Sequence, residues 1–198
     1  MNRQYNANQI QLITYIDRLS GGKIKDLHNM LQGPLAGLFD GVHLLPFYPP
    51  IDGEDAGFDP TDHTAVDSRL GGWSDIRTLA QDYPLMADMI VNHMSAQSPQ
   101  FTDVLEKGEA SPYWPLFLTR DKVFAADAPA EQLAAVYRPR PTPFFTDIAL
   151  KDGRKIPFWT TFTANQIDID VNSTAGKAYL QAILDRFTEN GVKYIRLD

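Results

Sequence analysis

The chain has 198 residues, 43% hydrophobic and 22% charged, so it can bury a substantial core and has the composition of an ordinary globular protein. Its formal net charge of -7, without any cluster of Lys and Arg, argues against nucleic-acid binding, which needs a concentrated basic face. The absence of cysteine excludes disulfides and thiolate chemistry, and no apolar run approaches the ~20 residues of a membrane helix, so we expect a cytoplasmic protein that contacts neither nucleic acid nor membrane.

The amino-terminal part of the chain alternates between strand and helix patterns. Residues 9–16 are rich in β-branched and aromatic side chains and predict a first strand, which a Ser-Gly-Gly turn follows. Residues 23–31 carry apolar side chains at the spacing of one helix face, and the short apolar run 41–47 predicts a second strand. The next segment, 48–60, contains three prolines and two glycines, which predicts an irregular loop of the length that often carries function.

The same patterns continue to the end of the chain, with one interruption. Helices are predicted at 74–80, 100–107 and 174–187, and strands at 86–93 and 192–198. Between them, the stretch 94–165 is rich in proline and aromatic residues and lacks the strand-helix alternation. We interpret it as a subdomain inserted after the third strand.

This order of elements predicts an α/β fold with a parallel sheet and right-handed crossovers. A doubly wound sheet and a (β/α)8 TIM barrel both satisfy it. The barrel is favoured because no glycine-rich phosphate turn follows the first strand and because polar residues gather at several strand ends. Since only four barrel strands are found, we expect the first half of a barrel from a longer protein, with strands 1–3 in residues 1–93 and the third helix and fourth strand in 166–198.

Four ordered segments resemble the signature segments of a known family. Segments 88–93 (DMIVNH), 166–170 (QIDID) and 194–198 (YIRLD) are similar to successive motifs of the α-amylase family of retaining glycoside hydrolases and transglycosylases, and 55–63 (DAGFDPTDH) to the segment after that family's second strand. Within the family, segment 137–141 (YRPRP) is similar to the branch that transfers glucose from sucrose to phosphate.

The resemblance implies a catalytic carboxylate at the end of the last strand. Retaining transfer needs one carboxylate to attack the anomeric carbon and a second carboxyl about 5–5.5 Å away to protonate the leaving oxygen. Asp198 matches the family's nucleophile, and Arg196, on the same strand face, is expected to keep it ionised and oriented. The second carboxyl is expected from a Glu on a following strand that has no match here, so residues 1–198 alone are expected to be inactive.

The resemblance also implies a set of sugar-binding residues. Asp55 matches the residue that binds the far hydroxyls of a terminal glucose, Phe58 supplies an aromatic platform, and His93 matches the histidine near the primary hydroxyl. The pocket walls are expected to include Tyr137, Phe162 and Gln166. Further residues are expected to be structural, and they are Asp88, Asn92, His43 and His63. We expect neither a metal nor an organic cofactor.

Two arginines on a proline-stiffened loop suit phosphate. If water exceeds phosphate by roughly four orders of magnitude, phosphate needs about 5.5 kcal/mol of preference to compete. Charge-assisted hydrogen bonds of about 1.5–3 kcal/mol each from Arg138 and Arg140 would supply much of it. An extended, polyproline-like backbone would direct the two side chains apart, so one is expected to hold phosphate and the other fructose. The alternative is a solvated basic loop.

The expected reaction is transfer of glucose from sucrose to phosphate through a covalent glucosyl-enzyme, which yields α-glucose 1-phosphate and fructose with retention. A homodimer is one assembly that such an enzyme could form. Two alternatives keep the mechanism: a phosphorylase for sucrose 6-phosphate or glucosylglycerate, and an α-glucoside hydrolase. A third, of another class, is an inactive sugar-binding relative.

Overall fold

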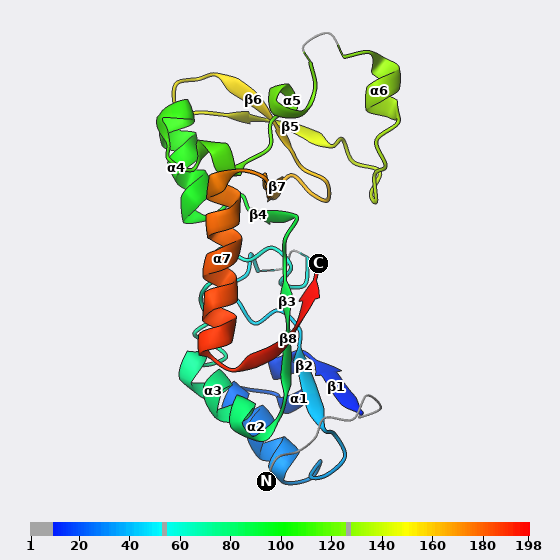
Figure 1. The fold of residues 1–198 in the computed structure, drawn as a ribbon, viewed down its shortest axis with the longest axis vertical. Coiled ribbons are helices and arrows are strands. Elements are labelled where there is room, and N and C mark those ends of the chain that lie inside the picture. Colours follow the sequence, from blue (N-terminus) through cyan, green and yellow to red (C-terminus); the bar gives the residue numbers. More distant parts are fainter. Residues whose placement is uncertain (1–9, 53–54, 126–127) are drawn as a thin grey trace.

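A four-stranded parallel sheet forms one end of the computed structural model, which describes residues 10–52, 55–125 and 128–198 (Figure 1). The strands lie in the order β1 (Gln11–Thr14), β2 (Gly41–Leu44), β3 (Leu85–Met89) and β8 (Val192–Leu197). All three neighbouring pairs are parallel. The spatial order follows the chain order without the reversal that a doubly wound sheet requires, so the half-barrel prediction is confirmed.

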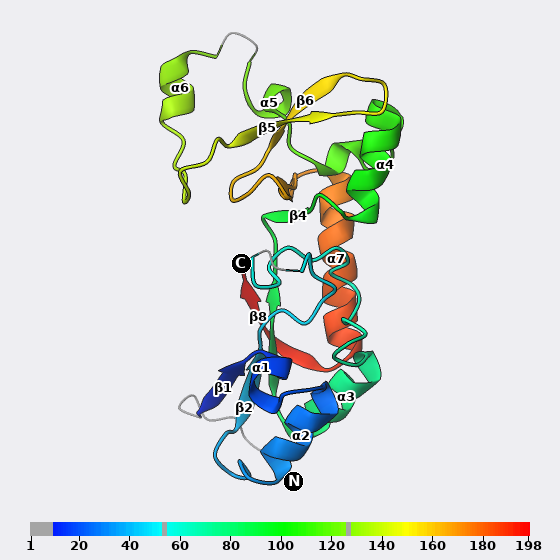
Figure 2. The ribbon, with the colours of Figure 1, turned by 180° about the vertical axis from the view of Figure 1, so that it is seen from behind.

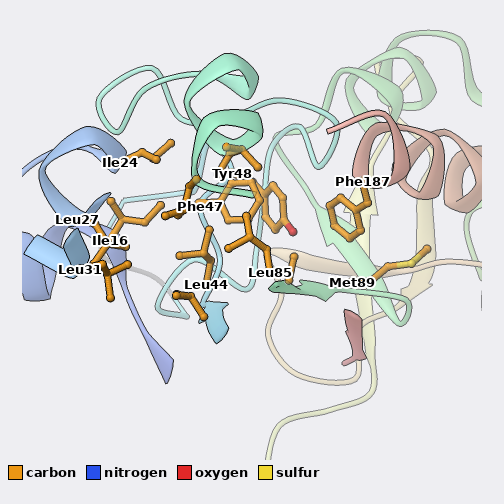
Figure 3. Close-up of a cluster of buried hydrophobic side chains, with 14 of the residues drawn as sticks. Ile16, Ile24, Leu27, Leu31, Leu44, Phe47, Tyr48, Leu85, Met89 and Phe187 are labelled. Carbon is orange, nitrogen blue, oxygen red and sulfur yellow. The ribbon is translucent and has the colours of Figure 1, made fainter. Parts of the chain in front are cut away.

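Helices pack this sheet into an apolar core (Figure 3). The helices are α1 (Ile16–Ser20), α2 (Ile24–Gln32), α3 (Trp73–Asp82) and α7 (Thr174–Glu189). The apolar positions of α2, namely Ile24, Leu27 and Leu31, are fully buried because their spacing puts them on one face. They pack in the same cluster as Phe47 and Phe187, which come from the loop after β2 and from α7.

A second packed region lies at the opposite end of the molecule (Figures 1 and 2). There β4 (His93–Ser95) pairs antiparallel with β7 (Gln166–Asp168), and β5 (Phe145–Ala149) pairs with β6 (Lys155–Trp159). The helical segments of this region are α4 (Pro99–Lys107), the 3-10 turns Gly108–Ala110 and Trp114–Leu116, α5 (Arg120–Val123) and α6 (Ala130–Ala134). None of the helices in the described part of the chain is long and apolar enough to cross a membrane.

Helix α7 connects the two regions and fixes their relative position (Figure 2). Tyr179 and Leu180 pack against both apolar clusters. The helix begins where the Ser173 hydroxyl accepts a hydrogen bond from the Gly176 amide. A Cβ on Gly176 would lie 2.0 Å from the Asp170 carbonyl oxygen, so the close approach of the chain at this turn requires glycine.

Most predicted elements are present, and three of them differ in their bounds. The third strand ends at Met89, and His93 begins the separate strand β4, because the chain leaves the sheet there to pair with β7. The first predicted strand is shorter, since α1 starts at Ile16; its first residue, Gln9, lies outside the described residues. Helix α3 begins after Gly72, whose amide donates to the Asp75 carboxylate. The described residues of 48–60 form neither helix nor strand, as predicted.

Candidate active site

Arg196 is the second-last residue of β8, and Asp198 directly follows the strand. Figure 1 marks this end of the chain with C. Being two residues apart, Arg196 and Asp198 point to the same face. Arg196 Nη2 donates to Asp198 Oδ1 at 2.8 Å, and its Nε lies 2.8 Å from Oδ1 of Asp88, which is the neighbouring residue on β3 in the strand register. One guanidinium therefore holds a fully buried carboxylate on one side and a half-exposed carboxylate on the other.

Asp88 is a buried acid with several partners. His43 Nε2 lies 2.9 Å from its Oδ1, and the Tyr48 hydroxyl donates to its backbone carbonyl at 2.7 Å. Its Oδ2 has no hydrogen-bond partner among the described residues. Burial raises the pKa of Asp88, the hydrogen bond and charge of His43 and the charge of Arg196 counteract this in part, and Asp198 raises it further. Asp88, expected to be structural, therefore makes a direct contact with the arginine that holds the candidate nucleophile.

Asp55 receives hydrogen bonds from two directions. A tight turn positions it: the Phe58 amide donates to the Asp55 carbonyl at 2.9 Å, with Ala56 and Gly57 at φ values of 53° and 88°. Gln166 Nε2 donates to Asp55 Oδ2 at 3.1 Å, and Arg140 Nη2 donates to Oδ1 at 3.0 Å. Burial alone would raise the pKa of Asp55, but these two donors outweigh it and lower the pKa, so the carboxylate stays ionised.

His93 is a neutral histidine with a defined tautomer. Its Nε2 lies 2.7 Å from the Phe58 carbonyl oxygen, which can only accept, so Nε2 carries a proton. The Gln166 amide nitrogen, 3.1 Å from the same Nε2, then directs its hydrogen bond to Asp55 instead. Burial lowers the pKa of His93 against the opposing effect of this bond and of the nearby charges of Asp168, Asp55 and Asp198. The ring nitrogen expected to donate to a sugar is thus already donating to the Phe58 loop.

The structure brings most of the predicted site residues into one cluster. Phe162 meets His93 edge-on, with ring centroids 5.3 Å apart, and the Arg140 guanidinium lies 5.9 Å from the Phe162 ring. The Arg196 guanidinium lies 5.4 Å from the Phe58 ring, so one charged group occupies part of the expected sugar platform. The cluster comprises Asp55, Phe58, His93, Arg140, Phe162, Gln166, Arg196 and Asp198.

Two predicted residues lie apart from this cluster. Tyr137 is 86% exposed, which does not fit the pocket wall that the sequence suggested. Arg138 lies over the Phe144 ring at 5.5 Å and has no hydrogen bond or ion pair to the cluster within the described ranges. Arg140, by contrast, reaches Asp55, so the two arginines of this loop point towards different partners.

Sequence reasoning missed the link between His43, Asp88 and Arg196. The three residues come from strands that are far apart in the chain, and His43 appeared as one more apolar-strand residue. The register of the strands could have indicated this link, because parallel strands of similar length bring the residues near their carboxyl ends together. Asp88 in the third strand and Arg196 in the fourth were therefore candidates for a pair.

A cavity of about 530 Å³ lies at the ends of β1 and β2, next to the Asp55 turn. Its lining includes Tyr15, Arg18, Pro46 and Gly57, and it does not include Asp198. The cavity is therefore distinct from the carboxylate cluster. Within the described ranges, no group of three or more His, Asp or Glu residues is arranged to hold a metal ion.

Comparison with known proteins identifies the family. The sequence profile of the alpha amylase catalytic domain matches residues 35–198. Together with the parallel half-barrel and the strand-end carboxylate, this match shows that the chain belongs to the α-amylase family.

Within that family, the chain is similar to disaccharide phosphorylases. It is 54% identical to sucrose phosphorylase from Agrobacterium vitis and 51% identical to sucrose phosphorylase from Bifidobacterium adolescentis, over 96% of its own length in both cases. It covers only 39% and 38% of those two proteins. The crystal structure of sucrose 6F-phosphate phosphorylase from Thermoanaerobacter thermosaccharolyticum superimposes with a TM-score of 0.90 at 34% identity, over 100% of this chain and 41% of that one.

Proposed function

We propose that this chain forms the first half of the catalytic barrel of a sucrose phosphorylase. The similarity to two sucrose phosphorylases at more than 50% identity supports this assignment. The site fits the proposal, since the carboxylate of Asp198 at the end of β8 provides one of the two carboxyl groups that a retaining glucosyl transfer requires. The substrates are sucrose and phosphate, and the products are fructose and α-glucose 1-phosphate.

In the proposed reaction, Asp198 attacks the anomeric carbon of the glucosyl unit. The bond from this carbon to the fructose oxygen breaks, a bond to a carboxylate oxygen of Asp198 forms, and fructose leaves with a proton from a second carboxyl. Phosphate then attacks the same carbon and releases Asp198. Two inversions give overall retention. Arg196, whose Nη2 donates to Asp198 Oδ1 at 2.8 Å, keeps the carboxylate turned towards the sugar.

The glucosyl unit is proposed to bind at the Asp55 cluster. Asp55 and Gln166 present a carboxylate and an amide, which together can accept from and donate to several hydroxyl groups. His93 holds the Phe58 loop beside them through its hydrogen bond to the Phe58 carbonyl oxygen. The Oε1 atom of Gln166 is buried and has no hydrogen-bond partner among the described residues, so it is available to a sugar hydroxyl.

One observation carries the assignment to a phosphorylase rather than a hydrolase. Arg140 reaches from the subdomain loop to Asp55, 3.0 Å away, and so brings a permanent positive charge next to the sugar-binding cluster. A guanidinium in this position would attract phosphate and give it the advantage over water that the reaction needs.

The free edges of the sheet support a further proposal, that the complete enzyme continues the barrel. Ile13 on the edge strand β1 is 61% exposed, and Leu197 on the edge strand β8 is 69% exposed. Apolar side chains on open sheet edges are unfavourable in water, and a barrel removes such edges by closure. The second carboxyl is proposed to come from the strand that follows β8.

The direct test is to incubate the complete enzyme with sucrose and inorganic phosphate and to measure glucose 1-phosphate and free glucose separately. We expect glucose 1-phosphate as the main product, with release of fructose in equal amount. Free glucose as the main product would assign a hydrolase, activity only with sucrose 6-phosphate or glucosylglycerate would assign a related phosphorylase, and binding without turnover would assign an inactive relative.

A further inference from the structure

His43 is a buried histidine that lies outside the cluster of predicted site residues and contacts Asp88. It lies in the middle of the sheet on β2, with an exposed fraction of 3%. Its Nε2 is 2.9 Å from Asp88 Oδ1, the same oxygen that Arg196 Nε contacts at 2.8 Å. Because a carboxylate oxygen only accepts, His43 Nε2 carries a proton and donates a hydrogen bond to Asp88.

These contacts form a continuous chain of polar side chains across three strands. His43 on β2 contacts Asp88 on β3, Asp88 contacts Arg196 on β8, and Arg196 contacts Asp198 at the end of β8. Two carboxylates therefore share one guanidinium. A hydrogen bond from another donor partly neutralises the Asp88 carboxylate and so weakens its attraction for Arg196. The interaction of Arg196 with Asp198 then becomes stronger.

We propose that His43 is a positioning residue for the nucleophile: by donating to Asp88, it leaves Arg196 free to hold Asp198 ionised and in place. The proposal rests on the function proposed above only in taking Asp198 as the nucleophile. His43 acts through two intermediate residues and touches no substrate.

Other titratable groups face this chain and must be considered. Tyr48 and His63, from the loop after β2, contact the backbone carbonyl of Asp88 and not its carboxylate. Tyr15, at the end of β1, feels the charges of both Asp88 and Arg196. Among the described residues, His43 is the one group besides Arg196 that has a hydrogen bond or ion pair to the Asp88 carboxylate. Asp88 Oδ2 is buried and has no hydrogen-bond partner in the part of the chain that the structure describes, so no donor there compensates for the loss of His43.

The test uses α-glucosyl fluoride as donor with the complete enzyme. Fluoride leaves without a proton from a general acid, so the acid limb of the pH profile of kcat/KM reports the ionisation of the nucleophile. This readout needs neither fructose recognition nor phosphate. A wild-type enzyme that releases fluoride but makes no glucose 1-phosphate from sucrose would therefore overturn the proposed function and still allow this test.

Three variants are expected to shift the acid limb of the kcat/KM profile differently, and one control is expected to leave it in place. His43→Leu removes the donor and is expected to move the acid limb up by about half to one pH unit, with kcat/KM reduced about tenfold. His43→Gln puts an amide donor near the position of Nε2 and is expected to restore the wild-type limb. Asp88→Asn ends the competition for Arg196 and is expected to move the limb down, even though turnover falls because Arg196 loses its charged anchor.

The matched control is His63→Gln. His63 is as buried as His43 but approaches only the Asp88 carbonyl, at 3.4 Å, so its replacement is expected to leave the acid limb in place. The proposal is overturned if His43→Leu has the wild-type limb or if His43→Gln is displaced. If His43→Leu does not fold, Asp88→Asn decides: a limb that stays or moves up contradicts the sharing of Arg196 between the two carboxylates.

Discussion

Arg140 donates to Asp55 across 3.0 Å, and this contact joins the subdomain loop to the loop that follows β2. Both side chains are only partly exposed, at 44% and 30%. The contact has a mechanistic consequence in the proposed reaction, in which sugar hydroxyls bind the same carboxylate. A bound glucosyl unit therefore competes with Arg140 for Asp55 and would free the guanidinium when the acceptor phosphate arrives.

Replacement of Arg140 by alanine is expected to reduce phosphorolysis more than hydrolysis. Loss of its charge-assisted hydrogen bonds to phosphate should lower the ratio of glucose 1-phosphate to glucose about 10- to 100-fold. The measurement is product analysis with sucrose and phosphate in the complete enzyme. Arg138→Ala is the matched comparison, because Arg138 lies over Phe144 at 5.5 Å, away from Asp55. An equal loss in both variants would argue against a separate role for Arg140.

Asp55→Asn is expected to weaken the sugar-binding step. The variant keeps the size of the side chain but loses the negative charge that Gln166 and Arg140 stabilise, so kcat/KM for sucrose should fall roughly 10- to 100-fold. Asp52→Asn is the control, since Asp52 lies on the same loop, is 75% exposed and pairs with Arg69. If both variants retain wild-type kinetics, Asp55 does not bind the sugar.

The buried histidine His63 should make stability depend on pH. Burial lowers the pKa of His63 from 6.5 to about 4 in the folded state. As the pH falls below 6.5, His63 becomes protonated in the unfolded chain but not in the folded one. The free energy of unfolding therefore declines until about pH 4. The shift corresponds to about 3 kcal/mol of unfolding free energy. Urea unfolding at pH 7 and pH 4 should show a correspondingly smaller decline in His63→Gln; an unchanged decline would exclude His63 as the cause.

Gly176→Ala is expected to destabilise the protein by about 1–3 kcal/mol or more. The added Cβ would lie 2.0 Å from the Asp170 carbonyl oxygen, and this backbone cannot move away without displacing α7. Gly72→Ala serves as the control: it precedes α3 at φ -149°, and an added Cβ there meets only Ser74 Oγ at 3.9 Å. Urea unfolding of both variants gives the comparison. Equal stability would mean that the chain relaxes freely around Gly176.

Local patterns in the sequence predicted helices α2, α3, α4 and α7 and the four parallel strands, because one-sided apolar spacing and short apolar runs are decided by neighbouring residues. The short helices α1, α5 and α6 were not predicted. The helix predicted at 23–31 is α2 at Ile24–Gln32, and the one at 174–187 is α7 at Thr174–Glu189. The pairing of β4 with β7 was not predictable in this way, since it joins His93 to Asp168 through a long intervening segment.

The same limit applies to the site. Motif resemblance selected Asp55, His93 and Asp198, which the structure brings into one electrostatic neighbourhood. It did not reveal that His43 and Arg196 share one oxygen of Asp88, because that contact depends on the register of three strands. Nor did it distinguish Arg140, which reaches Asp55, from the exposed Tyr137 on the same loop.

The role of Asp198 as nucleophile is tested most directly by trapping the covalent intermediate. The complete enzyme is mixed with α-glucosyl fluoride, quenched in acid within the first turnover, digested and analysed by mass spectrometry. We expect a hexose ester on the peptide that contains the end of β8. Fragmentation should locate it at Asp198, and it should be absent from Asp198→Asn. A hexose on another carboxylate, or steady turnover by Asp198→Asn, would contradict this role.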